Sequence, residues 1–597
     1  MLGSAPVERL VRFWREYAAD FSWSYAIGAV CLIATNAVAV AIPGFVQSAV
    51  DALGASGAEP NQAASDARAW GFAVIVSGLG VIVVRTLSRT FIFNPGRTIE
   101  LRLKNRLFDQ LLDLPRAYYD RVRPGELVSR GTNDANWVRA LVGFGSLQLV
   151  NVVLLLTFTL ARMFVDDWVL TLACVVPLAV AALALRVAVG VMFRATSQFN
   201  TELGVLSSRI LETYNGIGVL QSYGALGQAT ARFDATNASL ERLGTELARV
   251  RALLLPVVNV TGNLCVVIVL MLGGARVQSG ELTLGQLAAF TVYVNLLVSG
   301  MTGFGWLVNA VQRGWLSLGR MYEVIDAPTE RPASDAQLPD EGDVGCALSV
   351  RDLTFAYAGA AERPALSGVT FAVAPGETVG VFGLTGAGKS TLLSILARVY
   401  EPPSGTVLAD GVDITRVSIE AWRAVAACVP QEAWLFSATL AQNIALSERG
   451  AQPDPERLNR AVHDAGLAGE VEALPSGLDT LVGERGMTLS GGQRQRAALA
   501  RAYYRDFRLL LLDDVMSAVD HATEKHLIDA LYRRCGSATT MIVSHRCSVL
   551  ARADRVLVFE DGRLVDDAPH ALLAQRPGPY AKAWQLQQAA EALESAP

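Results

Sequence analysis

Six long apolar stretches in the first half of the chain restrict its fold more than any other feature. They lie near residues 23–46, 70–93, 141–164, 168–189, 253–275 and 284–311. Each is long enough for a helix that crosses the hydrocarbon core of a bilayer, which takes about 20 residues. Six such stretches without intervening strands are hard to bury in a soluble core, and only 18% of the residues are charged, which is low for a soluble protein. The sequence therefore predicts six transmembrane helices and not the buried helices of a soluble domain.

The basic residues between these stretches predict an orientation in the membrane. They gather in two long loops, between the second and third stretches and between the fourth and fifth: Arg97, Arg102, Lys104, Arg106, Arg116, Arg121, Arg123 and Arg130, and then Arg194, Arg209, Arg232, Arg242 and Arg249. The positive-inside rule puts both loops and both termini in the cytoplasm. Residues 1–20 are amphipathic and lack a cleavage site, which predicts an interfacial helix on the same side. We expect a multi-pass protein of the bacterial inner (plasma) membrane.

A glycine-rich segment in the second half matches G-x-x-x-x-G-K-[ST], the phosphate-binding loop. It consists of Gly383, Leu384, Thr385, Gly386, Ala387, Gly388, Lys389 and Ser390, followed by Thr391. The apolar run 378–382 predicts a buried strand before the loop, and residues 391–398 predict a helix after it, which is the context that the motif requires. Backbone N–H groups at such a helix N-terminus bind phosphates, Lys389 neutralises phosphate charge, and the Ser390 hydroxyl binds Mg²⁺. The segment therefore predicts a site for a nucleotide and Mg²⁺.

Further motifs follow the loop in a fixed order. Residues 489–493 precede a basic helix, and the apolar run 509–512 then carries Asp513 to the end of a buried strand, where a carboxylate completes a Mg²⁺ shell. In these motifs the sequence resembles the ATP-binding cassette (ABC) transporter superfamily, over nearly the whole chain. The resemblance assigns four more marks: Tyr357 stacks on adenine, Gln431 belongs to the Q-loop, residues 517–520 form the D-loop, and His545 is the switch histidine.

The resemblance implies an exporter-type (type IV) half-transporter, similar to multidrug and lipid exporters. We expect an all-α six-helix transmembrane domain at 1–325, a Pro-rich linker at 326–345 and an α/β P-loop ATP-binding cassette at 346–590. The two basic loops are expected to be helical extensions of the spans. Several short segments resemble family features: 114–120, 125–130 and 222–227 the coupling helices, 280–285 the entry to span six, and 483–486 the X-loop. No internal repeat is visible, so the other half must be a second chain.

The resemblance also implies roles for the motif residues. In this family two cassettes face each other head to tail, and each ATP lies between the phosphate-binding loop of one chain and the signature of the other. Ser490, Gly491, Gly492 and Gln493 are therefore assigned to ATP bound mainly by the partner. Mg²⁺ is assigned to Ser390, Gln431 and Asp513, and hydrolysis to Asp514, His545 and Gln431.

Asp514 departs from the family pattern, which usually has Glu at this position. The Asp carboxylate is set back by about one carbon–carbon bond, roughly 1.5 Å. A misplacement of about 1 Å can slow a reaction on the order of 10²-fold. The residue therefore predicts slow hydrolysis with ATP binding intact, and it favours a heterodimer whose partner carries the Glu. The alternatives are an acidic replacement that the site tolerates, and a homodimer.

The spans give little information about the transported molecule. Polar residues in the spans either line a cavity or bond between helices: Asn36, Asn151, Asn259, Asn263 and Asn295. The arginines in the spans lie toward span ends, from where they can reach the interface: Arg85, Arg89, Arg162 and Arg186. Without a mid-span charge, an apolar or amphipathic small molecule, lipid or peptide is favoured.

The function predicted from these features is ATP-driven transport, in the direction of export, by an ATPase in a dimeric transporter. Two alternatives remain: an importer on the same fold, and a nucleotide-gated regulatory or channel-like membrane protein, for which Asp514 is the argument. The net charge of −5 argues against a nucleic-acid partner.

Overall fold

The computed structural model describes residues 5–54, 60–329, 336–339, 345–360, 362–446, 448, 453–483, 486–516, 527–533, 536 and 538–594. The chain forms two compact units. The helical unit comprises Met1–Leu112 and Gly125–Ala327, and the α/β unit comprises Asp113–Pro124 and Pro328–Pro597. The short segment Asp113–Pro124, which holds the first predicted coupling helix, thus groups with the α/β unit.

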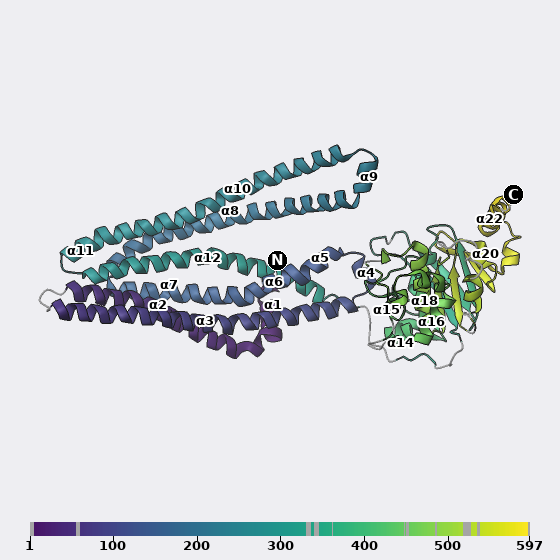
Figure 1. Cartoon of the computed structure of the whole chain (residues 1–597), viewed down its shortest axis with the longest axis horizontal. Helices are drawn as coiled ribbons and strands as arrows, with labels where there is room; N and C mark the ends of the chain where they lie inside the picture. The colour runs from purple at the N-terminus through teal and green to yellow at the C-terminus, as the bar shows by residue number, and fades with distance from the viewer. Residues whose placement is uncertain are drawn as a thin grey trace. The chain divides into compact units, whose positions relative to one another are not determined.

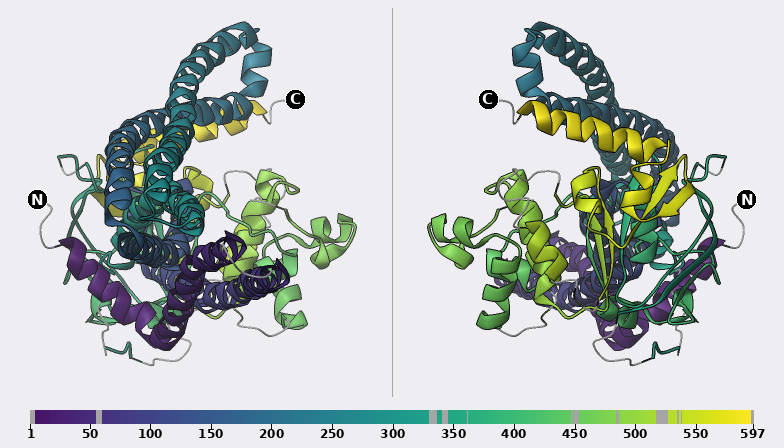
Figure 2. Two further views of the ribbon diagram at one scale, coloured as in Figure 1. Left: turned by 90° about the vertical axis from the view of Figure 1, so that its left-hand side faces the viewer. Right: turned by 90° about the vertical axis from the view of Figure 1, so that its right-hand side faces the viewer.

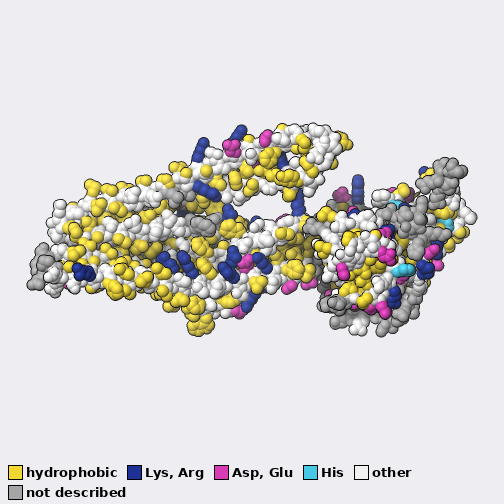
Figure 3. Space-filling view, viewed as in Figure 1, with side chains coloured by type: hydrophobic (Ala, Val, Ile, Leu, Met, Phe, Trp, Pro, Cys, Tyr) yellow, Lys and Arg dark blue, Asp and Glu magenta, His cyan; other side chains and the backbone are white. Residues whose placement is uncertain are grey.

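The helical unit consists of long helices in the order that the apolar stretches predict (Figure 1). Their bounds are α1 Ala5–Phe13, α2 Ser22–Gly54, α3 Pro60–Asp113, α5 Pro124–Ser129, α6 Ala135–Ala140, α7 Ser146–Asp166, α8 Trp168–Asn215, α9 Ile217–Ser222, α10 Leu226–Ile268, α11 Gly274–Gln278 and α12 Leu284–Ile325. Among the described residues, six helical stretches are long and apolar enough to cross a membrane. On the face shown in Figure 3, hydrophobic side chains are spread along the length of this unit. The six predicted spans are confirmed.

Polar residues between the spans define where the helices begin. Asp167 Oδ1 accepts a hydrogen bond from the Leu170 amide at 2.8 Å and so caps α8, directly after α7. Thr283 and Gln286 form a reciprocal capping box at the start of α12. Gly285 lets α12 approach α2, because a Cβ at this position would lie 2.3 Å from the Gln47 carbonyl oxygen.

Helices α8 and α10 extend far beyond a bilayer. The 48 residues of α8 span about 72 Å, whereas the hydrocarbon core is about 30 Å thick. The two helices pack chiefly against each other and are joined by α9 at their far end (Figure 1). The basic loop between the fourth and fifth spans is therefore a helical hairpin, as predicted.

Two polar residues in the spans bond between helices. Asn36 Nδ2 donates to Asn151 Oδ1 at 3.1 Å, joining α2 to α7, and also to the Leu32 carbonyl oxygen at 2.9 Å. For this pair the structure agrees with an interhelical contact and not with a cavity lining.

Near the end of α7, Arg162 pairs with Asp166 at 3.0 Å.

The α/β unit contains a six-stranded sheet and a four-stranded sheet, in the orders β10-β9-β3-β8-β7-β6 and β2-β1-β4-β5. The strands are β1 Leu348–Phe355, β2 Leu366–Val373, β3 Thr378–Gly383, β4 Val407–Ala409, β5 Val412–Asp413, β6 Ala426–Val429, β7 Leu509–Asp513, β8 Thr539–Val543, β9 Arg555–Glu560 and β10 Arg563–Ala568. Strands β3, β7 and β8 are buried at every residue, as parallel strands covered on both faces must be. Because β3, β8, β7 and β6 pair in parallel, their carboxyl ends meet at one edge of the sheet.

The same unit also contains helices. They are α4 Arg116–Tyr119, α13 Lys389–Leu396, α14 Ile419–Val425, α15 Leu440–Ile444, α16 Pro455–Asp464, α17 Ala468–Ala473, α18 Gly491–Tyr504, α20 Cys547–Leu550, α21 His570–Leu573 and α22 Pro579–Glu594. In Figure 2 the green helices α16 to α18 group on one side of the unit, away from the yellow strands β9 and β10. An all-α six-helix domain followed by an α/β domain is the predicted fold class.

Candidate functional site

The glycine-rich loop connects β3 to α13 at the carboxyl edge of the six-stranded sheet. Gly386 and Gly388 have φ angles of +87° and +92°, in the left-handed region that favours glycine. A Cβ on Gly388 would lie 2.6 Å from the Ala365 carbonyl oxygen, so no larger residue fits. The loop is followed at once by the N-terminus of α13, where the free N–H groups and the helix dipole favour an anion. This geometry fits a phosphate.

The side chain of Lys389 folds back against the start of the glycine-rich loop. Its Nζ donates hydrogen bonds to the carbonyl oxygens of Gly383 at 2.7 Å and Leu384 at 3.0 Å. Burial lowers the pKa of Lys389, and the neighbouring charges of Asp513 and Asp514 oppose this shift. The two carboxylates thus help to keep the ammonium charged and available to a phosphate.

Ser390 and Asp513 come together at the base of the loop. Burial raises the pKa of Asp513, while a hydrogen bond from Ser390 lowers it and the charge of Asp514 raises it. A hydroxyl and a carboxylate are ligands that Mg²⁺ prefers, so the pair fits this ion. Gln431 follows β6, the strand next to β7, and its residue is exposed at the same edge of the sheet.

Asp514 and His545 follow the adjacent strands β7 and β8. Asp514 is buried and has a φ of +49°, a conformation in which Asp is enriched among residues other than glycine. Its amide donates to the Val543 carbonyl oxygen at 2.9 Å, and its Oδ1 accepts from the His545 amide at 3.4 Å. The carboxylate thus contacts the backbone of the histidine loop, and the His545 residue is exposed.

Gln587 of α22 holds the histidine loop from its other side. Its Nε2 donates to the His545 carbonyl oxygen at 2.7 Å, and its Oε1 accepts from the Cys547 amide at 2.8 Å. The sequence gave no signal for this residue, because it lies 42 positions after His545 in a segment without a motif.

Tyr357 lies beside the loop in a cluster of aromatic rings. Its hydroxyl and the Thr391 hydroxyl form a hydrogen bond of 2.9 Å, and its ring meets that of Tyr400 edge to face at 5.2 Å between centroids. Tyr400, a second residue that the motifs do not indicate, donates to Asp120 Oδ2 at 2.7 Å. Burial, together with the bond to Asp120, raises the pKa of Tyr400 to about 12. The cluster thus connects Tyr357 with the segment Asp113–Pro124 of the same unit.

The signature residues begin α18. Ser490 and Gln493 form a capping box, in which Ser490 Oγ accepts from the Gln493 amide at 3.2 Å and Gln493 Oε1 accepts from the Ser490 amide at 2.9 Å. Ser490 and Gly491 are exposed. Within the described part of the chain, no hydrogen bond joins Ser490, Gly491 or Gln493 to the glycine-rich loop. The D-loop (517–520) and part of the X-loop (484–485) lie outside the described residues.

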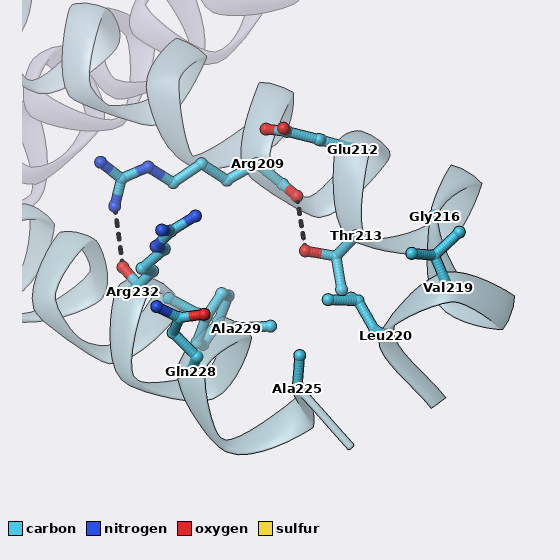
Figure 4. Close-up of a pocket in the computed structure, with 11 residues that line it drawn as sticks. Arg209, Glu212, Thr213, Gly216, Val219, Leu220, Ala225, Gln228, Ala229 and Arg232 are labelled. Atoms are coloured by element: carbon cyan, nitrogen blue, oxygen red, sulfur yellow. Dashed lines mark hydrogen bonds between the residues drawn. The ribbon is translucent and has the colours of Figure 1, made fainter. Parts of the chain in front are cut away.

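A separate cavity lies in the helical hairpin of α8 and α10, beside α9. It has a volume of about 540 Å³ (Figure 4). Arg209 donates to the Arg232 carbonyl oxygen at 2.8 Å across it. None of the motif residues lines this cavity.

Comparisons with known proteins agree over nearly the whole chain. Residues 25–301 match the family described as ABC transporter transmembrane region, and residues 366–517 match the family described as ABC transporter. A probable multidrug resistance ABC transporter ATP-binding/permease protein of Bacillus subtilis (strain 168) is 31% identical over 577 residues, which cover 94% of this chain and 95% of that protein. An ATP-dependent lipid A-core flippase of Burkholderia orbicola (strain AU 1054) is 30% identical over 593 residues, which cover 98% and 97%.

A solved structure is similar over nearly the whole chain. It is a bacterial Atm1-family ABC exporter with ATP bound, which is 25% identical and superposes with a TM-score of 0.81 over 96% of this chain and 98% of that chain.

Proposed function

Because this chain belongs to the ABC transporter family, we propose that it exports a hydrophobic or amphipathic substrate in an ATP-driven cycle, as one half of a dimeric transporter. The observation that carries this proposal is that one chain joins six membrane-spanning helices to a cassette whose loop, Asp513, Asp514 and His545 meet at one sheet edge. The similarity to exporters favours export over the importer alternative.

Each residue of the site has a different role in phosphoryl transfer. Bound Mg²⁺ supplies positive charge that neutralises the phosphates, and Ser390, Asp513 and Gln431 would hold it. The loop amides and Lys389 bind the phosphates, and Tyr357 receives the adenine ring. Asp514 orients the attacking water, and His545 contacts the γ-phosphate. The exposed Ser490 and Gly491, together with the half-buried Gly492 and Gln493, complete the ATP site of the partner chain.

Vectorial transport tests the export proposal. A fluorescent amphiphile is offered to inside-out membrane vesicles that contain the transporter. We expect accumulation that requires ATP and stops with a non-hydrolysable analogue. No accumulation with ATP contradicts export, and a conductance that the analogue opens supports a nucleotide-gated channel.

We also propose that the partner is a different half-transporter, with Glu at the position equivalent to Asp514. Asp514 weakens only the site on this chain's own loop, whereas the signature that this chain lends to its partner is intact. One slow site and one fast site fit a heterodimer, while a homodimer of this chain would have two slow sites.

The test compares this chain alone with this chain in complex with a candidate partner. We expect brisk ATPase activity only in the complex of the two chains. Changing the partner's Glu to Gln should abolish this activity. Asp514→Glu restores the carboxylate reach, so it raises the turnover of a homodimer roughly 10- to 100-fold. A homodimer with brisk activity that Asp514→Glu leaves unchanged overturns the proposal of a slow site.

A further inference from the structure

A second cavity lies within the helical unit, among α7, α8 and α12. Its volume of about 760 Å³ falls in the range of ligand sites, roughly 300–1,000 Å³. Apolar side chains and glycines make up most of its lining: Leu156, Ala182, Leu185, Val189, Gly190, Phe193, Gly300, Met301 and Val308. Such a wall suits an alkyl chain.

Arg186 carries the only charge among the described lining residues, and Gln312 is the other polar side chain. Arg162, another arginine of the spans, pairs with Asp166. In contrast, Arg186 makes no hydrogen bond or ion pair within the described ranges. A guanidinium without a protein partner in this mostly apolar cavity is available to pair with an anionic ligand.

Along α8, Arg186 lies within the apolar lining, with Ala182 and Leu185 before it and Val189, Gly190 and Phe193 after it. Arg186 lies 18 residues after Trp168, which corresponds to about 27 Å along α8 and nearly crosses a hydrocarbon core of about 30 Å. Leu156 precedes Asp166, at the adjoining end of α7, by ten residues or about 15 Å. The guanidinium can thus lie near the headgroups of one leaflet, while the Leu156 end of the cavity lies deeper in the membrane.

We infer that this cavity binds an amphiphile with an anionic headgroup, taken from the leaflet nearest Arg186. The planar guanidinium pairs with a carboxylate or phosphate through two parallel hydrogen bonds, and the alkyl chain occupies the apolar part. The inference rests on the proposed export function, for which it specifies the substrate class. A neutral amphiphile lacks the pairing, and a cationic amphiphile is repelled.

Photocrosslinking measures this selectivity directly. The full-length chain in proteoliposomes is irradiated with three probes of equal chain length that carry a diazirine in the chain: a fatty acid, the matching alcohol and the matching quaternary ammonium. We expect the fatty acid to label α8 and α12 about tenfold more than the alcohol. Arg186→Gln should remove this preference, and Arg186→Lys should retain most of it.

Arg85→Gln is the matched control, because Arg85 is a second exposed arginine of the spans and lies outside the cavity lining. It should leave the labelling preference intact. Equal labelling by all three probes, or a preference that survives in Arg186→Gln, overturns the inference.

The vesicle assay separates this inference from the export proposal. ATP-dependent uptake of a neutral amphiphile, without any preference for the fatty acid in crosslinking, refutes anion selectivity and leaves export standing. A preference that depends on Arg186, without uptake of any amphiphile, supports the anion site and contradicts export.

Discussion

Single residues at the edge of the six-stranded sheet determine what the ATP site can do. The loop and Asp513 could be predicted, because their chemistry depends on a strand that ends directly before them in the sequence. The contact of Asp514 with the His545 amide could not, because it arises from the parallel pairing of β7 with β8. The left-handed backbone of Asp514 also has no signature in the sequence.

Lys389→Ala should weaken nucleotide binding to this chain's own loop. The change removes charge-assisted hydrogen bonds to phosphate, which are worth about 2 kcal/mol or roughly 30-fold in affinity. Photolabelling of this chain with radioactive azido-ATP measures the effect. Lys582→Ala is the control, because Lys582 is an exposed lysine of the same unit. Unchanged labelling of Lys389→Ala would show that the loop does not bind the phosphates.

Whole elements were more predictable than their contacts. The spans follow from apolar length, whereas the caps that Asp167 and Thr283 form at the starts of α8 and α12 are findings of the structure. The packing of the C-terminal helix α22 against the histidine loop had no counterpart in sequence pattern, because it joins distant segments through a single amide side chain. This helix offers the sharpest test at the scale of elements.

Gln587→Ala should lower the kcat of ATP hydrolysis roughly 5- to 30-fold and leave the KM for ATP within about twofold, because it removes two hydrogen bonds worth about 1 kcal/mol each. Gln587 acts through the position of His545, so nucleotide binding should change little. Steady-state ATPase assays of the assembled transporter measure both constants.

Two further variants distinguish a role of Gln587 in positioning His545 from a contribution of Gln587 to the stability of the fold. Gln587→Glu keeps an acceptor for the Cys547 amide but cannot donate to the His545 carbonyl, so its kcat should also fall. Gln588→Ala changes the exposed neighbour on the same helix and should have no effect. A Gln587→Ala variant with a lower Tm and an unchanged kcat would mean that the residue only stabilises the fold.

At the scale of the whole molecule, the orientation in the membrane remains a prediction from charge. Arg121 and Arg232 are exposed and should be cytoplasmic, whereas the turn between α7 and α8 should be outside. Val165, which is 78% exposed, is a better reporter for that turn than Asp166, whose side chain is largely buried beside Arg162.

Single cysteines at 121, 165 and 232, in a background without the native cysteines, test this orientation. In intact cells a membrane-impermeant thiol reagent should label position 165 alone, and permeabilisation should expose the other two. Labelling of 121 or 232 in intact cells, with 165 protected, reverses the orientation.

The length of the α8–α10 hairpin has a mechanical consequence. If α8 crosses a core of about 30 Å, about 42 Å of it remains outside as a lever arm. A stiff arm of this length that pivots by about 5° moves its α9 end by about 4 Å, roughly two thirds of a helical turn. Arg186 also lies on α8, close to the point where the helix leaves the hydrocarbon core. If α8 pivots about that point, Arg186 moves by only a fraction of an ångström. A rigid pivot of α8 would therefore move the α9 end by several ångströms and the cavity wall near Arg186 by much less.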